Sequence, residues 1–170
     1  MGALPAANQY PATVRPGGVF MGAKTMIDPN KDFYGWTQET VEKLRQGKFS
    51  EVNMDDLIEE LEDMGRSERR ALESRLTVLL MHLLKWKHQP DRRGRSWAAT
   101  ISNQRLRVAR LLRDNPSLKQ HFAQIGIEAY ESAVLDAVAE TELDKDTFPA
   151  TFEQTGWTWA QVLDSEFLPE

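Results

Sequence analysis

The chain has 170 residues, of which 41% are hydrophobic and 28% charged, as expected for one globular domain with a real core. It has no cysteine, which excludes disulfides, thiolate metal ligands and cysteine nucleophiles. Its longest uninterrupted apolar run, residues 78–81, is far shorter than the roughly 20 residues that a membrane-spanning helix needs. Because the N-terminus also lacks the pattern of a secretory signal, we expect a soluble, cytoplasmic protein.

Positive charge is concentrated in the middle of the chain. Residues 66–120 contain fourteen Lys and Arg against four acidic residues, a net charge of +10, whereas the whole chain has a net charge of −5. The negative overall charge opposes general attraction to nucleic acid. A basic middle between acidic flanks therefore either binds an acidic partner or is neutralised by its own flanks.

The N-terminal part contains a leader and two predicted helix starts. Residues 1–27 carry prolines and glycines without apolar periodicity, and they predict a flexible leader, of native or cloning origin, that carries no fold. The domain is then expected to cover residues 28–170. Thr37 is a suitable cap for a short first helix that Gly47 would end, and Asn53 is a suitable cap for the next.

The central helix is predicted from the longest apolar pattern. Gly65 either ends the helix that follows Asn53 or lies within a longer one. Ser67 is a plausible cap for a further helix that runs to about Gln89, where Pro90 would stop it. Residues 76–84 are apolar nearly all round, which indicates burial on most sides.

Three more helices are predicted after the central one. Ser96 would cap a helix through Asp114, and the pair Asn115-Pro116 is a strong signal for the start of the next. Thr158 and Gln161 have the spacing of a capping box. Since no segment alternates with period two, we predict an all-α, single-domain bundle of about five to six helices around a buried central helix.

Several short motifs carry a resemblance to a known family over roughly residues 32–170. They are Asp32-Phe33-Tyr34-Gly35-Trp36, Leu57-Ile58-Glu59-Glu60-Leu61-Glu62, His82-Leu83-Leu84-Lys85-Trp86 and Ser96-Trp97-Ala98-Ala99-Thr100-Ile101. In this order they resemble the bacterial domain-of-unknown-function family numbered twenty-nine, although Asn53 stands where that pattern has aspartate. The resemblance implies an all-helical bacterial domain and assigns no activity to it.

A line of polar residues runs along the predicted central helix. Arg75, His82 and Gln89 are seven residues apart and therefore point in nearly the same direction, with Lys85 and Trp86 beside them. Burying these groups without partners would cost roughly 1–3 kcal/mol for each unmet group.

Two interpretations of this polar line are open. Glu59 and Glu62 would be its partners if the preceding helix packs antiparallel to the central one, and Gln104 interrupts the apolar stripe of a later helix. The favoured interpretation is a buried network that fixes the register of the bundle. The alternative is a polar pocket in an enzyme or metal-dependent site, with His82 as proton carrier.

A metal site of the usual kind is not predicted. Glu59, Glu62, His82 and His88 supply suitable side chains, but no glutamate stands three residues before a histidine, as in dinuclear sites of helical bundles. We therefore expect no metal and no cofactor.

Five arginines form the candidate binding face. Arg92, Arg93 and Arg95 lie in the loop before the helix that Ser96 would cap, and Arg107 and Arg110 share an outer face of that helix. With Trp97 nearby, this pattern is also typical of a groove for single-stranded nucleic acid. Solvation or pairing with the chain's own acids is favoured over nucleic-acid binding as the interpretation of this pattern.

From this face we predict a non-enzymatic interaction module that binds an acidic protein surface. The alternatives are a nucleic-acid-binding helical domain and, less favoured, the site centred on His82. We expect no membrane partner, and the sequence leaves the oligomeric state open.

Overall fold

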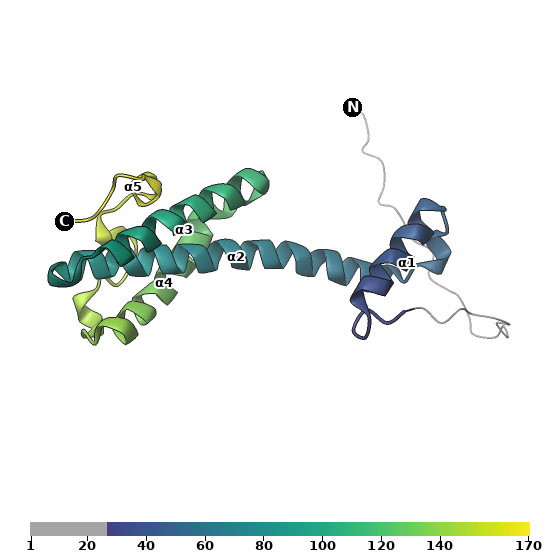
Figure 1. Cartoon of the computed structure of the whole chain (residues 1–170), viewed down its shortest axis with the longest axis horizontal. Helices are drawn as coiled ribbons and strands as arrows, with labels where there is room; N and C mark the ends of the chain where they lie inside the picture. Colours follow the sequence, from purple (N-terminus) through teal and green to yellow (C-terminus); the bar gives the residue numbers. More distant parts are fainter. Residues whose placement is uncertain (1–26) are drawn as a thin grey trace, which may run out of the picture. The chain divides into compact units, whose positions relative to one another are not determined.

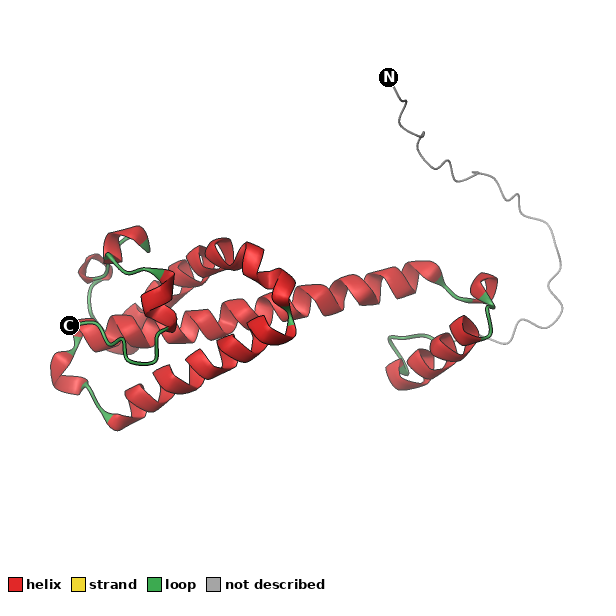
Figure 2. Cartoon of the chain, turned by 90° about the horizontal axis from the view of Figure 1, so that it is seen from above, coloured by secondary structure: helices red, strands yellow, loops and turns green. Residues whose placement is uncertain are grey.

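The computed structural model describes residues 27–170, and the predicted leader lies, apart from Ile27, outside them. The described residues form helices and loops without a strand (Figures 1 and 2), which confirms the all-α prediction. They divide into two compact units, of which the first ends at Asp56 and the second covers Leu57–Glu170. Among the described helices, none is both long and apolar enough to cross a bilayer.

The first unit contains α1 (Phe33–Arg45) and a short 3₁₀ helix, Phe49–Glu51. The start predicted at Thr37 is wrong, because Asp32 caps the helix and accepts a hydrogen bond from the Gly35 amide at 2.9 Å. Gly47 has a φ of 71°, the left-handed conformation expected just after a helix end. Because glycine adopts this conformation most readily, Gly47 correctly predicted the C-terminal end of α1.

α2 (Met54–His88) is one continuous helix of 35 residues. Its predicted start is confirmed, since the Asn53 side chain accepts hydrogen bonds from the amides of Asp55 and Asp56 at 3.2 and 3.4 Å. The further start at Ser67 is wrong, and Gly65 lies inside the helix. A glycine there costs only about 1 kcal/mol, which a long helix can absorb.

The core of the second unit is built around the C-terminal half of α2, beside which lie α3 (Arg95–Asp114) and α4 (Phe122–Thr141) (Figure 1). Six leucines of α2 are fully buried: Leu72, Leu76, Leu79, Leu80, Leu83 and Leu84. Full burial of such side chains contributes roughly 1.5–3 kcal/mol each. The prediction of a buried central helix is therefore confirmed.

Small residues line the inner side of α4. Ala129, Ala133 and Ala137 are fully buried, and Gly126 lies against the ring of Trp159. That tryptophan begins α5 (Trp159–Leu163) and stacks on Phe152 with ring centroids 3.7 Å apart. The small side chains thus let the C-terminal segment approach α4 closely.

The connections are short, and one predicted cap is fully formed. In the capping box the Thr158 hydroxyl accepts from the Gln161 amide at 3.2 Å, and the Gln161 side chain accepts from the Thr158 amide at 2.8 Å. Short 3₁₀ helices join the longer ones in the second unit, at Pro90–Arg92, Pro116–His121, Lys145–Thr147 and Glu153–Thr155. The strong start signal at Asn115-Pro116 therefore opens a 3₁₀ helix that leads into α4.

Candidate functional site

The polar line of α2 does not form one network. Arg75 is half-buried and makes no hydrogen bond or ion pair within the described residues. The His82 Nδ1 bonds to the Val78 carbonyl of the same helix at 2.9 Å, and the Gln89 side chain donates to the Thr141 carbonyl at 3.4 Å. The three residues point along one helix face, but each has separate surroundings.

The prediction that Glu59 and Glu62 are the partners of this polar line is wrong. Glu59 and Glu62 lie on the same helix as His82, because Gly65 does not interrupt α2. At 1.5 Å per residue, Glu62 and His82 are about 30 Å apart along the axis. Glu62 instead pairs with Arg66, one turn away, at 3.2 Å.

The buried cation of α2 has its partner on α4. Lys85 is only 7% exposed, and its Nζ lies 2.5 Å from a carboxylate oxygen of Glu140, a half-exposed side chain. The same ammonium lies 4.7 Å from the centre of the Trp97 ring, a contact worth about 0.5–2 kcal/mol. Lys85 therefore links α2, α3 and α4.

Two further predicted residues, Trp86 and Arg93, contact each other. The Arg93 guanidinium donates to the Trp86 carbonyl at 2.7 Å and lies 5.6 Å from the centre of that ring. It also reaches the Pro169 carbonyl at 3.5 Å. Arg93 thus helps to hold the C-terminus, which distinguishes it from the other arginines of the predicted face.

Gln104 is buried, as its inner position on α3 predicts, but it does not join the polar line. Its Oε1 accepts no hydrogen bond in the described part of the chain, and the same holds for the buried Nε2 of His88. The His88 ring instead packs edge-on against Phe148 at 5.1 Å. Neither atom is therefore hydrogen-bonded to another polar residue of the prediction.

The residue that the sequence interpretation missed is Arg105. Its guanidinium is buried and donates to three backbone carbonyls, those of Val162 at 2.9 Å, Ser165 at 3.3 Å and Phe167 at 2.6 Å. Burial lowers the pKa of Arg105, against the opposing effect of nearby Asp164 and Glu166. Its place in the inner stripe of α3, four residues after Ile101 and three before Val108, was the signal that could have found it.

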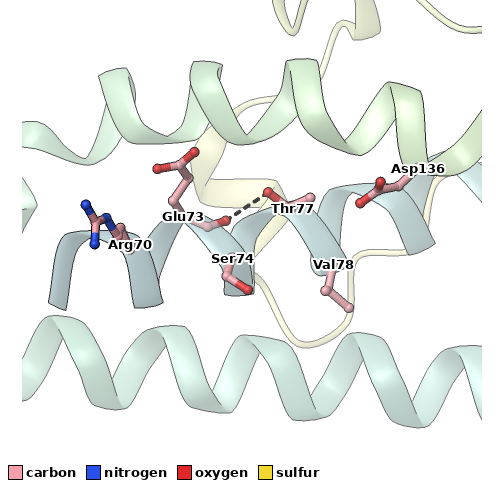
Figure 3. Close-up of a pocket in the computed structure, with 6 residues that line it drawn as sticks. All are labelled: Arg70, Glu73, Ser74, Thr77, Val78 and Asp136. Atoms are coloured by element: carbon pink, nitrogen blue, oxygen red, sulfur yellow. Dashed lines mark hydrogen bonds between the residues drawn. The ribbon is translucent and has the colours of Figure 1, made fainter. Parts of the chain in front are cut away.

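An open groove of about 340 Å³ lies in the second unit (Figure 3). Its lining residues are Arg70, Glu73, Ser74, Thr77 and Val78 from α2 and Asp136 from α4. The Thr77 hydroxyl donates to the Glu73 carbonyl of the preceding helical turn at 3.0 Å. His82 is not among the lining residues, so the predicted pocket around it does not coincide with this groove.

Within residues 27–170 no three His, Asp or Glu side chains come together in a way that could hold a metal ion. Glu59 and Glu62 are separated from His82 and His88 along α2, as described above. The four side chains that the sequence offered as ligands therefore do not share one site.

The stability of the second unit is expected to depend on the titration of His82. Burial lowers the pKa of His82 below its ordinary value of 6.5, Lys85 acts in the same direction, and the hydrogen bond to Val78 and the charge of Glu140 oppose it. The unfolded chain then binds the proton more tightly than the folded one. The stability is thus fully present above about pH 6.5 and is lost as the pH falls through the lowered folded pKa.

Urea unfolding between about pH 7 and pH 5 measures this dependence, and the His82→Gln variant should show a smaller loss. Burial and, to a smaller extent, the charge of Lys87 also lower the pKa of His88. His88→Gln should therefore reduce the loss of stability as well, and the double variant should have the weakest dependence of stability on pH. An unchanged slope in the double variant would contradict the assignment to these histidines.

The remaining arginines of the predicted face are exposed. A nearby counter-charge is that of Asp114, whose pKa is lowered by its hydrogen bond to Arg113 and also by the charge of Arg110. Arg92, Arg95, Arg107 and Arg110 form no ion pair with a carboxylate of the described residues, and neither does Arg93. The Arg107 guanidinium donates one hydrogen bond, to the neutral side chain of Asn103, at 3.2 Å. The five arginines are therefore not neutralised by direct ion pairs with acidic residues of the described part of the chain.

Three of these arginines lie on α3 with small or apolar neighbours. We define the α3 outer face as the exposed residues Arg95, Ala99, Ser102, Asn103, Leu106, Arg107, Ala109 and Arg110. Leu106 is 50% exposed, and α3 contains no acidic residue before Asp114. The face is consequently a basic strip with a leucine and short side chains between the charges.

Comparison with known proteins gives a family and no relative of known activity. The family model described as Domain of unknown function DUF29 matches residues 30–168. No curated protein matches the chain, and no solved structure does.

Proposed function

The chain belongs to the DUF29 family, and because the description of that family assigns no function, we propose one from its surface: a protein-interaction module. The α3 outer face binds an acidic helical surface of a protein partner. The observation that carries this proposal is a set of three exposed arginines around an exposed leucine. None of the three, Arg95, Arg107 and Arg110, forms an ion pair within residues 27–170.

The physical argument is one of complementarity. Unpaired guanidinium groups attract an acidic surface over a distance, which speeds the encounter and selects against basic partners. Arginine is also enriched in protein interfaces, because it combines charge with a weakly hydrated planar group. Ala99, Ser102 and Ala109 leave room for a partner helix to approach and to contact Leu106.

Two placements favour a protein over nucleic acid. Trp97, the aromatic residue expected beside the arginines, is half-buried and its ring is covered by Lys85. The Trp86 ring lies under Arg93. Single-stranded nucleic acid needs free aromatic faces on which its bases stack, and these two rings are already in use.

A charge-reversal variant tests the proposal. In Arg95→Glu, Arg107→Glu, Arg110→Glu, all three substitutions are on exposed side chains, so the fold should persist. Arg93 is left unchanged because it bonds to Trp86 and Pro169. A tagged full chain is used to capture partners from extracts of its own cells, and the variant should capture at least about tenfold less of any specific protein partner.

The matched control reverses three exposed basic residues that do not belong to α3, in Arg45→Glu, Lys48→Glu, Lys145→Glu. It has the same change in net charge and should capture as the unaltered chain does. Equal capture by the α3 variant would contradict the proposal. Capture of a nucleic acid that only the α3 variant loses would replace the protein partner by a nucleic acid.

A further inference from the structure

The part of α2 within residues 57–64, which we call the acidic segment, carries an apolar stripe that is open to solvent. Ile58, Leu61 and Met64 are 51%, 58% and 62% exposed. They follow one another at steps of three residues, so they lie along one side of the helix. Large apolar side chains that gather on one exposed face mark a site of interaction.

The acidic segment also carries charge of one sign. Glu59, Glu60, Glu62 and Asp63 give it four carboxylates, and it contains no basic residue. Arg66, just beyond the segment, pairs with Glu62 and Asp63, so the net charge of residues 57–66 is −3. At 100° per residue, Glu60 and Glu62 lie on the two edges of the apolar stripe. The segment therefore presents an apolar stripe between acids, which is the complement of a leucine between arginines on the α3 outer face.

We propose that the acidic segment of one copy docks on the α3 outer face of a second copy. The inference rests on the proposed function, since it names the partner of that same face. Direct pairing of two acidic segments is disfavoured because it would bring eight carboxylates together. In a symmetric pair each copy gives its segment and receives its partner's, so the contact forms twice.

A copy cannot satisfy its own α3 outer face in this way. The side chain of Asn115, the residue after α3, donates to Glu68 of α2 at 3.1 Å, which marks where α3 ends beside α2. Leu61 lies seven residues before Glu68, about 10 Å farther along the helix axis. Since α2 is continuous there, the segment lies beyond the end of its own α3 and is presented to another molecule.

The test is the oligomeric state of the full chain, measured by sedimentation equilibrium and native mass spectrometry from about 1 to 100 µM. The unaltered chain should form a dimer. The variant Arg95→Glu, Arg107→Glu, Arg110→Glu and the variant Glu60→Arg, Glu62→Arg should each be monomeric, because each alone places like charges against one another. The dissociation constant should rise at least about tenfold in each.

Mixing the two variants gives the decisive result. In the mixed pair both contacts again join opposite charges, so a heterodimer should appear at the sum of the two masses. The control Arg45→Glu, Lys48→Glu, Lys145→Glu should remain a dimer. Circular dichroism verifies that every variant keeps its helices.

Two outcomes would overturn the inference: an unaltered chain that is monomeric throughout, or variants that are still dimers. These failures are distinguishable from failure of the proposed function. If the chain is monomeric but the α3 variant loses a captured protein, the proposed function holds and the partner is a different protein. If the α3 variant dimerises and captures partners as the unaltered chain does, both proposals fail.

Discussion

Replacing Arg105 with methionine is expected to release the C-terminal segment from α3 and to lower the free energy of unfolding by about 3 kcal/mol or more. The guanidinium donates to the carbonyls of Val162, Ser165 and Phe167, and methionine can donate to none of them. Hydrogen bonds from a charged donor contribute about 1.5–3 kcal/mol each, and water can satisfy only the outer carbonyls. Urea unfolding gives the loss, and hydrogen exchange should localise it to residues 162–167.

Two variants make the result specific. Arg105→Lys keeps the charge but offers a single ammonium to three carbonyls that a planar guanidinium reaches together, so its loss should be intermediate. Arg107→Met removes an exposed arginine of the same helix and should change stability by less than about 0.5 kcal/mol. Equal stability of the two methionine variants would show that the three hydrogen bonds of Arg105 contribute nothing to the free energy of unfolding.

Replacing glycine with alanine is expected to lower the free energy of unfolding at Gly126 and to raise it at Gly65. A Cβ at Gly126 would lie 2.6 Å from Cζ2 of the Trp159 ring. That ring stacks on Phe152 at 3.7 Å and meets Phe122 edge-on at 5.5 Å, so it has little room to move. Overpacking of this kind should cost about 1–3 kcal/mol.

At Gly65 a Cβ would meet nothing within 4 Å, and the residue lies inside α2. Alanine there should stabilise the helix by up to about 1 kcal/mol, because glycine loses more backbone entropy. Thermal and urea unfolding should show the loss for Gly126→Ala, and slower hydrogen exchange around residue 65 should show the gain. A gain at Gly126 would contradict the packing of α5 on α4.

The candidate binding face combines what could and could not be predicted. The five arginines were found from their spacing, and four of them are exposed without structural bonds to other elements. Arg93 differs because its partners, Trp86 and Pro169, come together only when the C-terminus folds back on the domain. No local pattern contains that information.

Features that depend on a few neighbouring residues could be predicted from the sequence. The cap at Asn53, the left-handed Gly47 and the capping box of Thr158 and Gln161 are all formed as predicted. The burial of residues 76–84 followed from their periodicity. Each of these rests on hydrogen bonds or side-chain directions within one or two helical turns, which the local sequence encodes.

The contacts between groups far apart in the chain could not be predicted in this way. Lys85 finds Glu140 at a separation of 55 residues, and Arg105 finds Phe167 at 62. The continuity of α2 through Gly65 excluded Glu59 and Glu62 as partners of His82. Such pairings depend on how far each helix slides and turns against its neighbours, and that register is set by the summed packing of the whole core rather than by any short pattern in the chain.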